Sequence, residues 1–226
     1  MKQTFNIAID GPSGSGKSTL AKNLARTLSF IYIDTGALYR AVGLFAAEHG
    51  TTDDNLPDLI PLLPLCDLEM KLEDGGNAVY LEGRKLGDEI RTPSASHYAS
   101  QVSKIPEVRA FLLETQQAIA RTHNVIMDGR DIGTVVLPDA DLKLFMSASP
   151  EERANRRAAE LNAKGIPADP KQILADMQWR DANDKNREVA PAVPAPDAVF
   201  LDNTDLTPEG TLEKALELVR NAGILQ

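Results

Sequence analysis

Four residues near the start of the chain have the types and spacing of a phosphate-binding loop. Gly11, Gly16, Lys17 and Ser18 match the pattern G-x-x-x-x-G-K-[ST] at every fixed position. Glycines let backbone N–H groups turn inward around an anion, the lysine reaches the outer phosphates, and the serine hydroxyl can ligate Mg²⁺. We expect a nucleotide to bind through Gly11, Pro12, Ser13, Gly14, Ser15, Gly16, Lys17, Ser18 and Thr19.

Charged residues follow two other short apolar runs. The stretch 34–40 comes after the run 31–33, and the stretch 128–134 comes after the run 124–127. An acid at the end of a buried strand, here Asp128, fits the second Mg²⁺ position of phosphate-loop enzymes. The alternatives are a helix cap beside a solvated arginine and a tight turn with surface charges. The side chains that we single out are Asp34, Thr35, Arg40, Asp128, Arg130 and Asp131.

Arginines recur at helical spacing in two later segments. Arg153, Arg156 and Arg157 lie three and four residues apart, which predicts one face of a helix. Arg180, Asp184 and Arg187 repeat the pattern on the next predicted helix, which starts near Pro170. We expect the first face to contact phosphates and the second to suit an anionic ligand that carries a hydroxyl. The alternatives are a solvated face paired with neighbouring glutamates and an ion network that satisfies itself.

Apolar runs and helical patterns alternate along most of the chain, which is typical of parallel βαβ units. We predict an α/β fold in which a five-stranded parallel sheet carries the phosphate loop and is flanked by helices. Ligands of such sheets bind at the carboxyl ends of the strands, so the charged stretches should meet the loop there. The predicted strands are 5–9, 31–33, 124–127, 142–146 and 198–201.

The hydrophobic pattern of the sequence changes between residues 66 and 105. Apolar and polar residues alternate over 68–72 and 79–81, with a predicted turn at 74–77, which indicates a small antiparallel meander. We predict an inserted α+β lobe that clamps a second substrate, with Ser100 and Arg109 as its polar candidates; the alternative is an insertion without a function. The predicted core comprises 1–65, 106–150 and 186–226, the insert 66–105, and a helical lid with the arginine-bearing helices 151–185.

Composition excludes several classes of function. The formal net charge of −9 disfavours a nucleic-acid partner, and no apolar run approaches the roughly 20 residues of a membrane helix. A single cysteine, Cys66, and the absence of a signal-like start favour a reducing, cytoplasmic location. The three histidines match no ligand spacing, so we expect no metal site built by protein alone, and we expect no chemistry after residue 198.

The phosphate loop, the two charged stretches and the arginines of the two later helices together suit phosphoryl transfer to an acceptor that already bears a phosphate. Two like charges about 4 Å apart repel by on the order of 4 kcal/mol at an effective dielectric near 20, so arginines matter more than a general base. A phosphate acceptor needs little deprotonation, which agrees with the lack of a catalytic histidine. A hinged lid would keep water from the donor.

The chain resembles the bacterial cytidylate kinases of the nucleoside monophosphate kinase group. The resemblance is carried by 9–18, Asp34-Thr35-Gly36-Ala37-Leu38-Tyr39-Arg40, Asp128-Gly129-Arg130-Asp131-Ile132-Gly133-Thr134, and Arg180-Asp181 through Asn186-Arg187. It implies phosphorylation of CMP or dCMP by ATP with Mg²⁺. The implied catalytic residues are Lys17, Arg130, Arg156, Arg180 and Arg187, and the implied metal ligands are Ser18 and Asp128.

The same resemblance assigns the two substrates to different residues. Arg153 and Arg157 would join the phosphate loop on ATP. Asp131 would read the cytosine edge with Ser100 and Arg109, because a carboxylate accepts from the amino group. The implied CMP-binding set is Thr35, Arg40, Ser100, Arg109, Arg130, Asp131, Arg180, Asp184 and Arg187. We expect a monomer.

Two other functions stay open from the sequence. One is a kinase for another small acceptor, such as UMP, dTMP or shikimate. The other is a nucleotide-gated switch that binds or hydrolyses ATP, although no tail, coiled coil or basic patch for a partner is evident.

Overall fold

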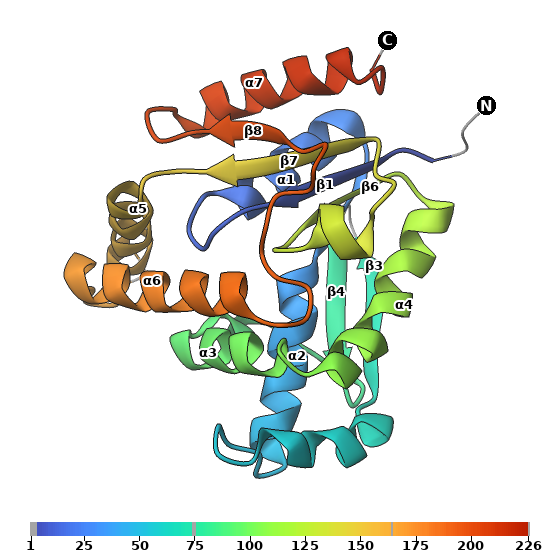
Figure 1. Cartoon of the computed structure of the whole chain (residues 1–226), viewed down its shortest axis with the longest axis vertical. Helices are drawn as coiled ribbons and strands as arrows, with labels where there is room; N and C mark the ends of the chain where they lie inside the picture. The colour runs from blue at the N-terminus through green and yellow to red at the C-terminus, as the bar shows by residue number, and fades with distance from the viewer. Residues whose placement is uncertain (1–3, 74–75, 164, 226) are drawn as a thin grey trace.

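A five-stranded parallel sheet forms the centre of the computed structural model, which describes residues 4–73, 76–163 and 165–225. The strands lie in the order β2-β6-β1-β7-β8 (Figure 1). The predicted α/β fold with a parallel sheet is confirmed. The strands are β1 (Asn6–Asp10), β2 (Ile31–Asp34), β6 (Val125–Asp128), β7 (Leu142–Ser147) and β8 (Val199–Asp202).

Helices cover both faces of this sheet, which is why its strands are continuous apolar runs. Ile7 and Ile9 of β1 pack in the layer of α1 (Lys17–Leu28) and α7 (Pro208–Asn221). Ala8, on the opposite face, packs in the layer of α4 (Pro106–Thr122). Burying each isoleucine contributes on the order of 2 kcal/mol.

Three strands end side by side at one edge of the sheet. Asp34 of β2 pairs in register with Asp128 of β6, and Ile9 of β1 pairs with the same residue from the other side. The phosphate loop follows β1 directly. The register therefore brings both charged stretches to the edge that carries the loop, and the stretch after β6 lies between the loop and the stretch after β2.

The insert holds the predicted antiparallel meander of β3 (Leu68–Glu73), β4 (Gly76–Leu81) and β5 (Arg84–Lys85). Residues 74 and 75 of the predicted turn lie outside the described residues. The meander shares one hydrophobic core with α2 (Thr35–Glu48) and α4. The domain boundaries therefore stay a prediction. The insert also contains the 3₁₀ helix η2 (Asp88–Arg91) and the helix α3 (Pro93–Val102), and the 3₁₀ helix η1 (Leu56–Leu65) precedes it.

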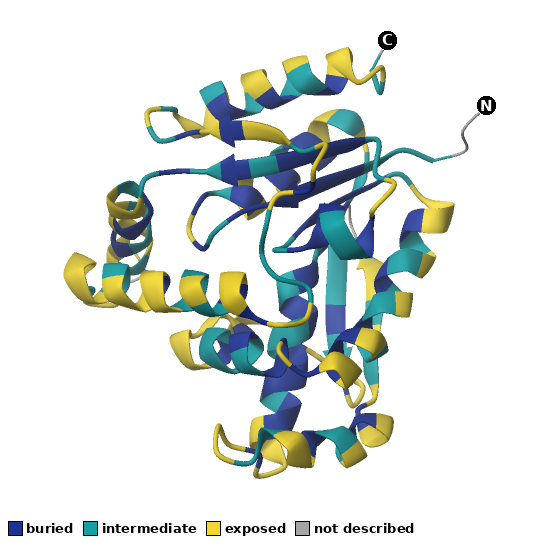
Figure 2. Ribbon diagram, in the orientation of Figure 1, coloured by how far each residue is buried: buried dark blue, intermediate teal, exposed yellow. Residues whose placement is uncertain are grey.

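The predicted lid consists of two helices, α5 (Pro150–Ala163) and α6 (Pro170–Asn186). Along α6 only Met177 and Asp184 are buried, and Figure 2 shows most of this helix as exposed. Trp179 of α6 stacks on His97 of α3, with ring centroids 5.2 Å apart and ring planes at 13°. This stack joins the lid to the insert.

One local feature matches the helix-cap alternative drawn from the sequence, and another differs from the sequence pattern. The helix α2 begins at Thr35, directly after β2, because the Asp34 carboxylate caps it by accepting from the Ala37 N–H at 3.0 Å. A short π-helix, η3 (Ile132–Val136), follows β6 where only a loop was expected. In the described part of the chain, no helix is both long and apolar enough to cross a membrane.

Candidate active site

A cavity of about 830 Å³ lies where the strand ends face the lid. This volume falls within the range of small-molecule sites. The predicted residues that line it are Ser13, Gly14, Gly16, Lys17, Ser18, Thr19, Thr35, Arg40, Ser100, Asp128, Arg130, Asp131, Arg156, Arg157, Arg180, Asp184 and Arg187. The predicted residues Gly11, Pro12, Ser15, Arg109 and Arg153 are not part of the lining.

The phosphate loop can fold only with a glycine at its first position. Gly11 has φ +145°, and a Cβ atom there would lie 2.0 Å from the carbonyl oxygen of Met146 on β7. The chain then turns and enters α1 at Lys17. The positive end of this helix therefore points at the loop, where it favours an anion.

Lys17 is buried under its own loop. Its Nζ donates to the carbonyl of Pro12 at 2.6 Å and lies 3.4 Å from the Ser15 hydroxyl. Burial lowers the pKa of Lys17 to about 7; Arg130 adds to this effect, and nearby aspartates oppose it. Among the described residues Lys17 forms no ion pair within 4 Å, so an incoming phosphate would supply a direct negative partner.

Ser18 and Asp128 form an oxygen-rich pair on the floor of the cavity. The Ser18 hydroxyl donates to Asp128 Oδ2 at 2.7 Å, and the Tyr32 hydroxyl donates to Oδ1 at 2.8 Å. Burial, and then the charge of Asp34, raise the pKa of Asp128. Among the described residues no three His, Cys, Asp or Glu side chains gather closely enough to hold a metal. A hydroxyl and a carboxylate suit Mg²⁺, which commonly takes its remaining ligands from water and phosphate.

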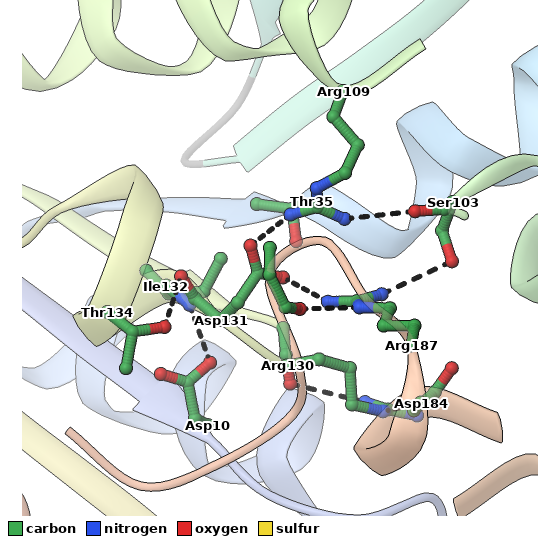
Figure 3. Close-up of polar contacts among 12 residues, drawn as sticks. Asp10, Thr35, Ser103, Arg109, Arg130, Asp131, Ile132, Thr134, Asp184 and Arg187 are labelled. Atoms are coloured by element: carbon green, nitrogen blue, oxygen red, sulfur yellow. Dashed lines mark hydrogen bonds and ion pairs between the residues drawn. The ribbon is translucent and has the colours of Figure 1, made fainter. Parts of the chain in front are cut away.

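Asp131 is held between two arginines from different elements. Arg187, just after α6, donates from Nη2 to Asp131 Oδ1 at 2.8 Å, and Arg109 of α4 pairs with Oδ2. Figure 3 shows both guanidinium groups directed at this carboxylate. Ser103 anchors the pair, because Arg187 Nη1 lies 3.2 Å from its hydroxyl oxygen and Arg109 Nη1 lies 3.4 Å from its carbonyl oxygen. The arrangement fixes one carboxylate at the cavity wall.

A second ion pair crosses the same wall. Arg130 Nε donates to Asp184 Oδ2 at 2.9 Å, and the Ser100 hydroxyl donates to Asp184 Oδ1 at 3.3 Å. Asp184 raises the pKa of Arg130 against the opposing effect of burial, so this arginine stays charged. The insert, the β6 loop and α6 therefore meet at Asp184.

Two guanidinium groups at the cavity keep an N–H without a partner. The buried Nε atoms of Arg40 and Arg180 make no hydrogen bond within the part of the chain that the structure describes. Arg40 pairs with Asp34 at 2.9 Å through Nη2. Burial, and then Arg130, lower the pKa of Arg180 to about 10, which still leaves it charged at neutral pH. Such donors indicate an anion site between the loop and the insert.

The three arginines of α5 do not share one environment. Arg156 donates to the carbonyls of Asn203 and Thr204 at 2.8 and 3.2 Å, and Arg157 pairs with Glu160 at 2.6 Å. Both line the cavity, whereas Arg153 is buried behind the phosphate loop. Their spacing predicted one shared face, but Arg153 packs on the phosphate loop and donates to the Ser13 carbonyl at 2.7 Å, whereas the other two reach the cavity.

Sequence reasoning missed several residues of the site. The segment after β8, where no chemistry was expected, contributes Asn203, Leu206, Pro208 and Thr211 to the lining. The end of β8 is itself the carboxyl end of a parallel strand, which was the signal available. Tyr39 also lines the cavity and lies under the Arg109 guanidinium group, 5.5 Å from ring centroid to Cζ.

Comparisons with known proteins identify one family. A family model described as cytidylate kinase matches residues 7–221. Curated cytidylate kinases from Caldicellulosiruptor saccharolyticus and Caldicellulosiruptor bescii are each 50% identical over 214 residues, covering 95% of this chain and 95% of theirs. Among solved structures, an uncharacterized protein from Eubacterium ventriosum matches with a TM-score of 0.50 at 12% identity, covering 96% of this chain and 99% of that chain; this likeness concerns the fold alone.

Proposed function

The chain belongs to the cytidylate kinase family, and from this membership we infer that it transfers the γ-phosphoryl group of ATP to CMP or dCMP. The products are ADP and CDP or dCDP. The observation that carries this function is a single cavity that joins a phosphate loop to an acceptor wall of arginines and aspartates. A kinase for UMP or dTMP and an ATP-gated switch remain as alternatives for the test.

The donor half of the site is the phosphate loop. Its backbone N–H groups and the N-terminus of α1 would surround the β- and γ-phosphates of ATP. Lys17 would leave the Pro12 carbonyl for the γ-phosphate, and Arg157 would approach the phosphates from the lid. The residues proposed for ATP are Gly11, Pro12, Ser13, Gly14, Ser15, Gly16, Lys17, Ser18, Thr19 and Arg157.

Ser18 and Asp128 would hold a Mg²⁺ ion that accompanies ATP. When bound, the ion would neutralise charge on the β- and γ-phosphate oxygens. The Ser18–Asp128 hydrogen bond supports this role, because both oxygens already converge at the cavity floor. The chain supplies these two ligands, and the nucleotide and water would supply the others.

The acceptor half holds CMP by its phosphate, sugar and base. Arg40, Arg130 and Arg180 would bind the phosphate, and the unpartnered Nε atoms of Arg40 and Arg180 support this. Asp184 would accept hydrogen bonds from the sugar hydroxyls. Asp131 would accept from the cytosine amino group with its remaining lone pairs, since each carboxylate oxygen can accept twice. Thr35, Ser100, Arg109 and Arg187 complete the proposed set.

The reaction needs close approach of two phosphates and little proton transfer. An oxygen of the CMP phosphate forms a bond to the γ-phosphorus while the bond from that phosphorus to the β,γ-bridging oxygen breaks, and ADP leaves. Arg130, Arg180 and Arg187 would screen the repulsion, which amounts to about 4 kcal/mol per charge pair at 4 Å and an effective dielectric of 20. Arg156 would contribute from the lid, and closure of the lid would exclude water.

A coupled assay of ADP formation with a panel of nucleoside monophosphates tests this function. We expect turnover to depend on CMP or dCMP and to be far lower with UMP, dTMP or no acceptor. ATP turnover that does not increase with CMP would contradict the kinase. Asp131→Ala should raise KM for CMP much more than KM for ATP, and equal losses would refute base reading by Asp131.

We also propose that the insert 66–105 carries the acceptor and that residues 151–185 form the moving lid. Two observations support this: Ser100 reaches Asp184, and α6 is mostly exposed. We propose a cytoplasmic monomer that binds no nucleic acid, which the net charge of −9 supports.

A further inference from the structure

Two residues of the lid helices, Asp181 and Arg153, form hydrogen bonds with Ser13 of the phosphate loop. The carboxylate of Asp181, on α6, accepts a hydrogen bond from the Ser13 N–H at 2.9 Å. Arg153, on α5, donates from Nη1 to the Ser13 carbonyl at 2.7 Å and to Asp181 Oδ2 at 2.5 Å. The three residues therefore form a closed ring in which each contacts the other two. We call this ring the loop clasp.

The loop clasp is built into the packing between the loop and the lid. The Arg153 side chain is only 6% exposed, and its Nε also donates to the Ala148 carbonyl at 3.2 Å. Gly14, the next loop residue, has φ +73°, and a Cβ atom there would lie 2.8 Å from Cε of Met177 and 3.3 Å from Cβ of Arg153. Both lid helices thus pack directly on the loop, and a shift of either helix acts on its backbone.

The charge of Asp181 matters at this place. Its negative charge acts on the cations that would meet phosphates: it partly offsets the lowering of the pKa of Lys17 and Arg180 by burial, and it adds to the raising of the pKa of Arg130 by Asp184. An unneutralised carboxylate here would repel the phosphates of an incoming nucleotide. Arg153 places a positive charge against Asp181 on the side away from the cavity lining.

We propose that Asp181 and Arg153 are positioning residues for the phosphoryl donor. They orient the peptide groups on both sides of Ser13, and Arg153 cancels the charge of Asp181 so that the loop can accept ATP. Neither residue needs to touch the nucleotide, and this role replaces the direct ATP contact that spacing predicted for Arg153. The proposal rests on the kinase function above and adds a route by which lid position controls the donor site.

A double-mutant cycle of Arg153→Met and Asp181→Asn tests the proposal. The first readout is binding of AMP-PNP with Mg²⁺ by calorimetry without CMP, and the second is KM for each substrate. We expect Arg153→Met to weaken AMP-PNP binding about tenfold or more, because it leaves the negative charge of Asp181, 21% exposed, without its ion-pair partner beside the phosphate site. Asp181→Asn should weaken it about threefold, and the double variant should bind within about threefold of Asp181→Asn. KM for CMP should change less than about twofold.

The exposed pair Arg121–Glu114 on α4 provides a matched control, since Arg121→Met, Glu114→Gln and their double should leave AMP-PNP binding unchanged. Arg153→Lys keeps the charge but loses the forked donors, so it should bind AMP-PNP more tightly than Arg153→Met and less tightly than the parent. If Arg153→Met does not fold in a thermal unfolding scan, Arg153→Lys and the charge-balanced double variant carry the test. The proposal would be overturned if the double variant lost AMP-PNP affinity by the product of the two single losses. It would also be overturned if AMP-PNP and CMP were weakened equally. A parent enzyme without CMP-dependent turnover would refute the function instead, because AMP-PNP binding needs no turnover.

Discussion

Arg130 Nε and Asp184 Oδ2 lie 2.9 Å apart and connect the loop after β6 to the last turn of α6. One partner sits at the end of a central strand, and the other belongs to the lid. Ser100 of the insert also donates to Asp184, so three separate segments meet at one carboxylate. The proposed acceptor site is therefore held by residues of α6 as well as by a loop of the sheet.

Replacing Asp184 with asparagine should weaken CMP selectively. The amide would keep the size of the side chain but leave Arg130 without its charged partner, and removing one member of a buried pair costs several kcal/mol. We expect KM for CMP to rise about tenfold or more and KM for ATP to change about twofold at most. The measurement is the coupled assay at saturating co-substrate. The exposed Asp176→Asn, on the same helix, should behave as the parent, and a parallel rise of both KM values would contradict the assignment.

Lys17→Ala should remove transfer while leaving the fold intact. The lysine would follow the γ-phosphate as charge develops, so its loss should lower kcat at least about 100-fold. Single-turnover measurement of ADP formation with CMP present checks this. Lys104→Ala, which removes an exposed lysine after α3, serves as the control. Unchanged turnover in Lys17→Ala would refute the role of the loop.

The metal requirement should respond to Asp128. The substitution Asp128→Asn removes the negatively charged ligand from the floor of the cavity. We therefore expect the Mg²⁺ concentration that gives the half-maximal rate to rise about tenfold or more. The titration of Asp128→Asn is made at fixed ATP and CMP, with excess EDTA abolishing the rate in the parent. Asp139→Asn, which alters an exposed acid before β7, should leave the titration unchanged. A curve for Asp128→Asn that overlays the parent's would exclude Asp128 as a ligand.

Cys66 should be slow to react in the folded protein, with a distinctive pH profile. Burial, and then Glu82 and Asp67, raise the pKa of this thiol to about 12. Only the thiolate reacts, so labelling should accelerate about tenfold per pH unit from pH 7 to 10 without a plateau, whereas the unfolded chain should level off above about pH 9. The chain has one cysteine, so stopped-flow labelling with a disulfide reagent reads this site alone, and Cys66→Ser is the blank. A native plateau near pH 9 would contradict the shift.

The backbone architecture was largely predictable because parallel strands are buried on both faces. Runs such as Ile7-Ala8-Ile9 therefore differ clearly from the helical patterns around them. The residues that follow each strand end could then be assigned to the edge of the sheet where the site lies. The phosphate loop could also be predicted from the sequence, since only glycine fits at position 11. The insert could be recognised by its change from helical to alternating periodicity.

The sequence did not predict which charged side chains line the cavity and which are buried behind the phosphate loop. Arg153 and Arg157 lie four residues apart on one helix, yet one is buried behind the loop and the other lines the cavity. That difference arises from how closely α5 packs on Gly14, which is a tertiary distance and leaves no periodic signal. The π-helix after β6 was missed for a similar reason: Asp10 accepts from the Ile132 and Gly133 N–H groups at 2.8 and 2.7 Å across 122 and 123 residues.

The stack of Trp179 on His97 gives this molecule an intrinsic optical reporter. Trp179 is the sole tryptophan of the chain, and its partner belongs to the insert rather than to the lid. Indole emission therefore registers separation of these two bodies without any label. Under the lid closure proposed above, ATP and CMP would each change this emission, and mixing them in either order would show which one acts first.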